Sequence, residues 1–337
     1  MTDITILGAG IFGLSIGWAA ARRGARVCVI DPAGPGAGAS GGLVGALAPH
    51  APEDWTPAKA FQLDALLMAA DWWATVAGAG GRDPLYARSG RLQPIADEAA
   101  LSRAEARARS AREFWHGAAV WEIVPAAAAA PWLPPPPTGL VVRDSLSARI
   151  APRAALSALV AAIVARGGRI VTEGTPRGAL VHATGHEGLA GIPPLGTGVR
   201  GQAALLAYDA RDLPQIYAEG LHIVPHGDGM TAIGSTTERD WGVGQAGTDD
   251  RLDAVIARAR ALCPALAVAP VTERWAGIRP RASSRQPILG AHPHRPGAFI
   301  ANGGFKIGFG LAPRIAEVMV DLVLEGRDAV PEAFRPV

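Results

Sequence analysis

Near the start of the chain, two short apolar runs flank a stretch in which apolar residues recur at helical spacing. Residues 3–7 and 26–30 are short apolar runs, which predict two buried strands. Between them, apolar side chains recur at helical spacing over residues 11–23, which predicts a helix packed on those strands. The chain therefore begins with a strand, a helix and a second strand.

The same two periods predict the elements of the remaining chain. Helices are expected over 58–77, 98–115, 152–166, 249–262 and 311–325, and strands over 169–172, 179–183, 203–208, 221–225, 230–234, 271–275 and 298–301. Residues 32–46 are rich in Gly, Ala and Pro, which predicts a loop. Residues 125–137 are Pro and Ala apart from Trp132 and Leu133, which predicts a stiff surface connection.

This order of elements indicates an α/β protein with two discontinuous domains. The chain has 337 residues, 49% hydrophobic and 18% charged, which is typical of a globular protein long enough for two cores. We expect a Rossmann-type domain from residues 1–60, 140–200 and 285–337. Residues 61–139 and 201–284 are expected to form a second, α+β domain around an antiparallel sheet.

Charge and cysteine usage exclude several classes of protein. The formal net charge is +2 and the basic residues are scattered, so we expect neither a nucleic-acid nor an anionic-membrane partner. Cys28 and Cys263 are far apart and show no metal-ligand or disulfide spacing. No apolar run reaches about 18 residues, and the N-terminus lacks the pattern of a signal peptide. These features predict a cytoplasmic protein without a metal site or a membrane span.

A glycine fingerprint joins the first strand to the first helix. Gly8-Ala9-Gly10-Ile11-Phe12-Gly13 has the spacing that lets a chain turn tightly, approach a pyrophosphate and pack helix against strand. The helix N-terminus would receive the phosphates, and Asp31, at the end of the second strand, would accept hydrogen bonds from a ribose. The fingerprint predicts a dinucleotide but does not distinguish FAD from NAD.

Three further segments resemble one family of flavoproteins. They are Gly38-Ala39-Ser40-Gly41-Gly42-Leu43-Val44-Gly45-Ala46-Leu47-Ala48-Pro49, Trp275-Ala276-Gly277-Ile278-Arg279-Pro280 and Gly303-Gly304-Phe305-Lys306-Ile307-Gly308-Phe309-Gly310-Leu311-Ala312-Pro313. Together with the fingerprint, and in the same order, they resemble the FAD-dependent D-amino-acid oxidase superfamily, in particular its glycine oxidase and sarcosine oxidase branch. The small residues at 39–45 would admit a flat ring, whereas a flexible loop is the alternative.

The resemblance implies a set of cofactor-binding residues. They are Gly8, Gly10, Ile11, Phe12, Gly13, Asp31, Pro32, Ala39, Ser40, Gly41, Gly42, Leu43, Thr184, Gly185, Arg279, Gly303, Gly304, Phe305, Lys306, Ile307 and Gly308. In this family the last helix points its N-terminus at the flavin, where its dipole stabilises the charge of the reduced ring. No cysteine lies in the C-terminal glycine segment and no histidine beside the fingerprint, so the FAD is expected to be noncovalent.

Three residues are the candidates for the catalytic site. In the resembling oxidases the arginine at Arg279 clamps the substrate carboxylate, a task that suits a planar fork of donors; a structural arginine is the alternative. His222 stands where the family often presents a tyrosine, and it is a carboxylate donor, a base or a packed histidine. Lys306 stands where glycine oxidases have an arginine. It keeps the positive charge but lacks the planar pair of donors of a guanidinium; a solvent-exposed lysine is the alternative. Tyr217 and His50 are weaker candidates.

The resemblance implies an enzyme that oxidises the C–N bond of a small amino acid or secondary amine. Hydride would pass to flavin N5, the imine would hydrolyse to a carbonyl compound, and the reduced FAD would give H2O2 from O2 or reduce another acceptor. One alternative is a flavin-binding subunit of a larger amine dehydrogenase. Another is an enzyme like the FAD domain that oxidises carboxymethylaminomethyl-uridine in tRNA. The substrate, the acceptor and the number of chains stay open.

Overall fold

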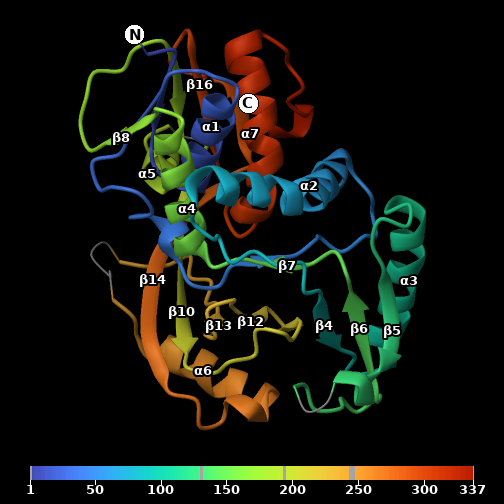
Figure 1. The fold of residues 1–337 in the computed structure, drawn as a ribbon. Helices are drawn as coiled ribbons and strands as arrows, with labels where there is room; N and C mark the ends of the chain where they lie inside the picture. The colour runs from blue at the N-terminus through green and yellow to red at the C-terminus, as the bar shows by residue number, and fades with distance from the viewer. Residues whose placement is uncertain (1, 130–131, 193–194, 243–246, 337) are drawn as a thin grey trace.

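The fold places one mainly parallel sheet above one mainly antiparallel sheet (Figure 1). The computed structural model describes residues 2–129, 132–192, 195–242 and 247–336. The upper sheet has six strands, in spatial order β15 (Ile288–Ala291), β16 (Ala298–Asn302), β9 (Ala179–His182), β1 (Ile4–Leu7), β2 (Val27–Ile30) and β8 (Arg169–Val171). All neighbours in it are parallel except β15 and β16.

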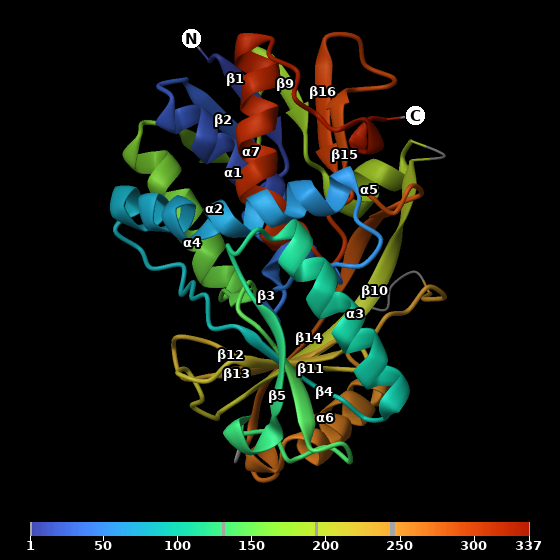
Figure 2. The same ribbon diagram turned by 90° about the vertical axis from the view of Figure 1, so that its right-hand side faces the viewer.

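Helices cover the six-stranded sheet because their apolar faces and the buried strands form one core. The helices of this layer are α1 (Ile11–Arg22), α2 (Pro57–Gly80), α4 (Pro152–Ala165) and α7 (Gly308–Glu325). The short α5 (Gly185–Ala190) packs instead against two strands of the other sheet. α1 packs against α4 and α7, and α2 packs against the same two helices. Figure 2 shows α2 lying across the molecule, between its two halves. Thr56 is the N-cap of α2, because its hydroxyl accepts a hydrogen bond from the Lys59 amide at 3.3 Å.

The lower sheet has eight strands. In spatial order they are β14 (Val271–Ala282), β10 (Gly196–Leu206), β13 (Thr231–Gly234), β12 (Leu221–Pro225), β11 (Gln215–Ala218), β4 (Arg91–Pro94), β6 (Leu140–Asp144) and β5 (Trp121–Pro125). β10 and β14 pair from Gly196↔Ala282 to Leu206↔Val271. α6 (Asp250–Leu262) packs against β10, β12 and β13, and α3 (Glu98–Phe114) packs against β5. A small sheet of β3 (Ala46–Leu47) and β7 (Ala148–Arg149) lies apart.

The expected fold class is confirmed, and most long elements end within a few residues of the predicted bounds. The strands β4, β5, β6, β11 and β15 were not predicted, because they are short and several hold Pro, Arg or Gln. The prediction of a surface connection over 125–137 agrees with the exposed residues Pro125, Pro134, Pro135 and Pro137, but it is wrong for the two large side chains. Trp132 and Leu133 are buried, and the Trp132 indole donates to the Pro214 carbonyl at 2.8 Å. Residues 130 and 131 lie outside the described residues.

The predicted domain ranges remain a proposal. All six strands of the upper sheet come from 1–60, 140–200 and 285–337. However, β6 and the first residues of β10 (196–200) join the lower sheet, and α2 packs against helices of the upper layer. A division that follows the sheets would move these three segments. Among the described helices, none is long and apolar enough to cross a bilayer.

Candidate functional site

The glycine fingerprint forms a turn that only small residues can occupy. Gly8 has a φ of +105°, and a Cβ there would overlap the carbonyl oxygen of Ala183, on the segment after β9. A Cβ on Gly13 would overlap the Gly8 carbonyl oxygen. The Gly8 amide donates to Ile30 at 2.8 Å. The turn is therefore held against β2 and β9 with no room for side chains, as a close approach to a cofactor requires.

The N-terminus of α1 and the end of β2 present the groups that a dinucleotide binds. The Ile11 amide, in the first turn of α1, donates to the Ser40 hydroxyl at 3.0 Å. The Asp31 carboxylate accepts from the Ala9 amide at 2.7 Å and from the Ala33 amide at 3.0 Å. Helix N-terminal amides suit a pyrophosphate, and a carboxylate has further lone pairs for ribose hydroxyls. These groups fit the adenosine diphosphate part of FAD.

The other predicted cofactor segments meet at this turn. A Cβ on Gly304 would lie 2.7 Å from the Phe12 ring, so the C-terminal glycine segment packs on the first turn of α1. α7 begins there, at Gly308. Thr184 follows the Ala183 carbonyl that contacts Gly8, and Gly185 accepts a hydrogen bond from the Asn302 side chain at 2.9 Å. Segments nearly 300 residues apart in sequence are thus brought together.

The small residues after Ser40 lie against the indole of Trp275. A Cβ on Gly42 would be 3.1 Å from this ring, and a Cβ on Gly277 would overlap it. A hollow of about 210 Å³ adjoins the ring and is lined by residues 37–39 and by β14. Arg153 of α4 donates to the Gly41 carbonyl at 2.8 Å. Trp275 belongs to a predicted motif, but its motif predicts no role for it, and Arg153 was not predicted from the sequence.

Arg279 on β14 is a buried cation that forms no ion pair with any residue that the structure describes. Its Nη1 donates to the Thr236 carbonyl at 3.2 Å, and no ion pair to it is found within the described residues. Burial lowers the pKa of Arg279 to about 10, and the charge of Glu238 opposes that shift. A guanidinium in this setting remains protonated at neutral pH. A buried charge is costly unless it is paired, so the site favours an anionic ligand.

Lys306 adds a second positive charge near Arg279. Its Nζ donates to the Thr237 hydroxyl at 2.8 Å and lies 5.8 Å from the centre of the Phe305 ring. The residue is exposed as a whole, but partial burial of the ammonium group, together with the charge of Arg279, lowers the pKa of Lys306 to about 8. Lys306 is therefore mostly cationic at neutral pH and titrates just above it.

His222 on β12 lies in the same cluster and is neutral. Burial lowers its pKa to about 3, and the charges of Arg91, Lys306 and Arg279 act in the same direction. Its Nδ1 is buried without a hydrogen-bond partner in the described structure, and its ring centre is 4.7 Å from that of Tyr217. The structure thus gathers the three predicted catalytic residues, with Tyr217 beside them.

Arg91 was not predicted from the sequence. It is only 5% exposed, and its Nε donates to Asp144 at 2.8 Å while its guanidinium lies 5.5 Å from the Tyr217 ring centre. An arginine is usually exposed, so no periodicity marks it as buried. His50, in contrast, is exposed, and its amide donates to Gln62 at 2.7 Å. No contact of the His50 ring with the cluster is found in the described part of the chain.

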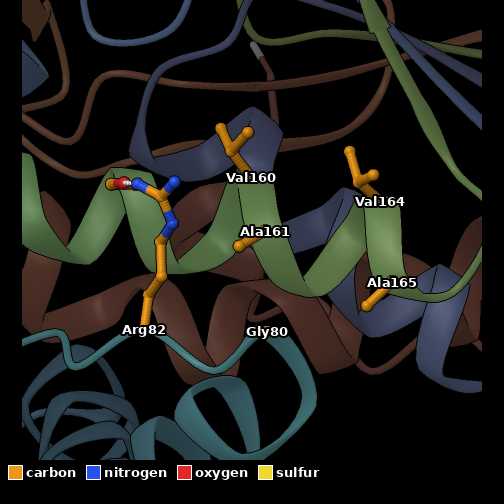
Figure 3. Close-up of a pocket in the computed structure, with 7 residues that line it drawn as sticks. Gly80, Arg82, Val160, Ala161, Val164 and Ala165 are labelled. Atoms are coloured by element: carbon orange, nitrogen blue, oxygen red, sulfur yellow. Dashed lines mark hydrogen bonds between the residues drawn. The ribbon is translucent and has the colours of Figure 1, made fainter.

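A larger hollow lies elsewhere and has no catalytic groups. Figure 3 shows this hollow between the end of α2 and α4. Its volume is about 510 Å³. Its lining is Gly80, Arg82, Ser157 and four small apolar residues, and Arg82 donates to Ser157 at 2.7 Å. It shares no residue with the cluster around Arg279. Within the described residues, no group of three or more His, Cys, Asp or Glu could hold a metal ion.

The comparisons with known proteins identify the family. The profile of the FAD dependent oxidoreductase family, DAO, matches residues 3–322. The chain belongs to the FAD dependent oxidoreductase family. FAD is therefore its cofactor class, as predicted, and the NAD alternative is excluded. Noncovalent binding and the individual contacts to FAD stay predictions.

Curated relatives match parts of this FAD dependent oxidoreductase. The glycine oxidase of Pseudomonas aeruginosa is 33% identical over 141 residues, which are 41% of this chain and 38% of the relative. The glycine oxidase of Bacillus subtilis is 31% identical over 112 residues, 32% of this chain and 29% of the relative. The bifunctional protein ThiO/ThiG of Nostoc is 27% identical over 96% of this chain and 53% of the relative. The matches thus span less than two thirds of each relative.

Solved structures are similar over nearly the whole chain. The glycine oxidase of Geobacillus kaustophilus has a TM-score of 0.86 at 21% identity, covering 99% of this chain and 98% of that one. The iminodiacetate oxidase of Chelativorans sp. BNC1 has a TM-score of 0.86 at 23% identity, covering 99% of both chains. At these identities the likeness shows the fold of the FAD dependent oxidoreductase.

Proposed function

We propose that this FAD dependent oxidoreductase oxidises the C–N bond of a small amine that bears a carboxylate, such as an amino acid or an N-substituted glycine. The observation that supports it most is the buried Arg279 guanidinium, which has no ionic partner among the described residues. Relatives named glycine oxidase and a structural neighbour named iminodiacetate oxidase support the same class of substrate.

Each residue of the cluster has a role in this proposal. Arg279 binds the substrate carboxylate, for which its planar fork offers two parallel hydrogen bonds. Lys306 contributes a second positive charge to the same anion. His222 is neutral, so it offers a hydrogen bond without adding charge.

The same charges favour the reactive form of the amine. Arg279 and Lys306 disfavour a third cation beside them, which lowers the pKa of a bound substrate ammonium and favours the neutral amine. FAD, when bound, would supply the acceptor for the hydride that leaves the α-carbon of that amine. Because the neutral amine already has its lone pair, no strong protein base is needed; the imine then hydrolyses to a carbonyl compound and ammonia or a smaller amine.

Anaerobic mixing tests the proposal. Glycine, sarcosine, proline, iminodiacetate and D-amino acids are each added to the purified holoprotein while the visible flavin absorbance is recorded. At least one should bleach it, and the proposal fails if none does. Repeating the assay in air with a peroxide detector, and then with a quinone, identifies the acceptor, and turnover by the chain alone argues against an obligatory partner subunit.

A pair of arginine variants on β14 tests the role of Arg279. Arg279→Ala should raise the KM of the carboxylated substrate about a hundredfold, as expected for loss of a buried charge partner. Arg274→Ala is the matched control, because Arg274 lies on the same strand but forms an exposed ion pair with Asp253. An unchanged KM in Arg279→Ala removes the carboxylate-binding role.

A further inference from the structure

Both cations of the site are held by one short segment, residues 236–238. The Thr236 carbonyl accepts a hydrogen bond from Arg279, and the Thr237 hydroxyl accepts one from Lys306. These two contacts come from adjacent residues, although Arg279 and Lys306 belong to different parts of the chain. The position of the 236–238 segment therefore sets the positions of both cations.

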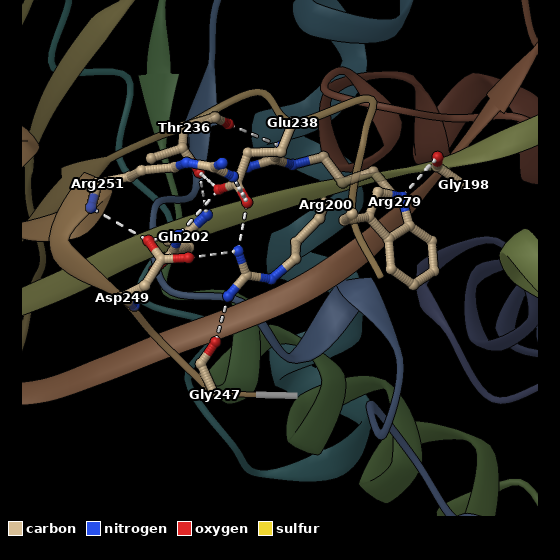
Figure 4. A network of polar contacts seen from close by, with 10 residues as sticks. Gly198, Arg200, Gln202, Thr236, Glu238, Gly247, Asp249, Arg251 and Arg279 are labelled. Atoms are coloured by element: carbon tan, nitrogen blue, oxygen red, sulfur yellow. Dashed lines mark hydrogen bonds and ion pairs between the residues drawn. The ribbon is translucent and has the colours of Figure 1, made fainter. Parts of the chain in front are cut away.

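Glu238 anchors this segment through its carboxylate (Figure 4). Oε1 accepts from the Thr236 hydroxyl at 2.5 Å and from the Gln202 amide group at 2.9 Å. Oε2 pairs with the guanidinium of Arg200 and accepts from Arg251 at 3.0 Å. Glu238 is 7% exposed and Arg200 is 2% exposed. Since hydrogen bonds to buried ionised groups are strong, this carboxylate fixes the segment firmly.

The anchor extends into β10 and α6. The backbones of Arg200 and Glu238 exchange two hydrogen bonds, at 2.9 and 3.0 Å. Arg200 also pairs with Asp249 at 3.1 Å, and Asp249 caps α6 by accepting from the Arg251 amide. Gln202 donates to Asp249 at 2.7 Å. The 236–238 segment is thus tied to the pairing of the sheet and to the first turn of a helix.

Charge pairing in this network leaves Arg279 available to a ligand. The carboxylate of Glu238 is already paired with Arg200 and Arg251, and it acts on Arg279 only through space, by opposing the drop in its pKa. The segment offers Arg279 a neutral backbone carbonyl as hydrogen-bond acceptor, and not a carboxylate. The segment can therefore orient the guanidinium without neutralising it.

We propose that Glu238 is a positioning residue that sets the place of both Arg279 and Lys306 by anchoring the 236–238 segment. This inference rests on the proposed function, because it assigns the two cations to a substrate carboxylate. Loss of the Glu238 charge loosens the segment, which its backbone hydrogen bonds to Arg200 still hold, and lets both cations shift. Affinity for a carboxylated substrate then falls by more than the rate of the oxidation step, because the carboxylate contacts the two cations directly and the amine is affected by them only through space.

Glu238→Gln in the holoprotein tests this, because glutamine keeps the size and can still contact Thr236 and Gln202. The substrates are sarcosine, or whichever carboxylated amine bleaches the flavin, and its primary amide, which lacks the negative charge. We expect KM for the carboxylate to rise about tenfold, the effect of one weakened charge-assisted contact, with kcat changed less than about twofold. KM for the amide should stay the same. Equal changes for both substrates, or none, overturn the proposal.

Controls separate this proposal from the function on which it rests. Glu122→Gln removes the exposed pair with Arg143 on β5 and β6 and should change neither KM. If the wild-type protein oxidises no amine, the proposed function fails. If it does and Arg279→Ala raises KM while Glu238→Gln does not, the positioning role alone fails.

A milder variant covers the case in which Glu238→Gln does not fold or loses its flavin. Arg251 contacts Glu238 from the solvent side, with 54% of its side chain exposed. Arg251→Gln should shift the ratio of the two KM values in the same direction by a smaller factor. An unchanged ratio in that variant overturns the proposal.

Discussion

Gly201 on β10 lies directly against the guanidinium of Arg279 on β14, and a Cβ at Gly201 would overlap that group. Gly201 pairs with Gly277, and Arg279 pairs with Val199 two residues away. Because side chains two residues apart share a face of a strand, Arg279 extends over the pair of glycines. The absence of a side chain at Gly201 is therefore what lets Arg279 reach its position.

Gly201→Ala is predicted to displace Arg279 while preserving the fold. The overlapping atoms belong to the end of a flexible side chain, which can move, whereas the backbone pairing of β10 and β14 is unaffected. We expect KM for the carboxylated substrate to rise about tenfold or more, since small errors of placement weaken binding strongly. Steady-state kinetics on the purified variant measures this. Gly78→Ala, on an open face of α2, is the control and should leave KM unchanged.

The pH dependence of substrate binding is predicted to follow Lys306. Its pKa of about 8 lies below the ordinary value for lysine, so its charge is present below pH 8 and is lost as the pH rises through 8. KM for the carboxylated substrate should accordingly rise above pH 8. In Lys306→Arg the rise near pH 8 should disappear, because the new guanidinium keeps its charge throughout this range. KM measured from pH 6 to 10 checks this, and an identical profile in both proteins would argue against it.

His222 is predicted to contribute no ionisation between pH 5 and 8. Its pKa of about 3 leaves the imidazole neutral throughout that range. His222→Asn should therefore change the size of kcat/KM without changing the shape of its pH profile. If the wild-type profile has a limb near pH 6 to 7 that disappears in the variant, His222 is a titrating base and this prediction is wrong.

The buried pair of Arg91 and Asp144 is predicted to support the lower sheet. Asp144 is fully buried and Arg91 is 5% exposed, so Asp144→Asn leaves an uncompensated charge in the interior. We expect a loss of about 3 to 5 kcal/mol in the free energy of unfolding, measured by urea denaturation of the holoprotein. Asp253→Asn, in an exposed pair with Arg274, is the control and should have little effect. Equal losses in both variants would contradict the prediction.

Asp31→Ala is predicted to weaken FAD binding. Asp31 accepts from the Ala9 amide inside the glycine turn, and its remaining lone pairs suit ribose hydroxyls. The variant should fold but lose visible flavin absorbance on dialysis, and added FAD should restore it at a higher concentration than the wild type needs. Full retention of flavin after dialysis would remove Asp31 from the cofactor site.

The sequence predicted those elements whose structure depends on residues close together in the chain. The turn at 8–13 and the strands on either side of it follow from local periodicity and glycine spacing. Arg279, His222 and Lys306 were named through the resemblance to a flavoprotein family, and their catalytic roles stay predictions. β4 and β11 were missed because each has only four residues and depends on its sheet neighbours.

The supporting residues around the site could not be predicted in this way. Gly201 acts on Arg279, and Glu238 acts on Gln202 and Arg200. Strand pairing brings these partners together from between 36 and 78 residues away. Nothing in their immediate sequence differs from an ordinary strand or loop. Trp132 and Leu133 were assigned to the surface because their proline-rich surroundings are typical of linkers. In the structure Trp132 contacts Pro214 and Cys263, and both residues belong to the core cluster of the lower sheet.

Trp275 beside the cofactor loop and Arg279 in the cation cluster lie on one strand, four residues apart. At about 3.3 Å per residue, β14 sets a separation of roughly 13 Å between their backbones. Both side chains share a face only while the number of residues between them stays odd. Inserting or deleting a single residue in 276–278 would turn Arg279 to the opposite face of the sheet. In divergent descendants of this chain, substrate preference can therefore change by replacement of residues along β14, but not by a change of one residue in its length at this point.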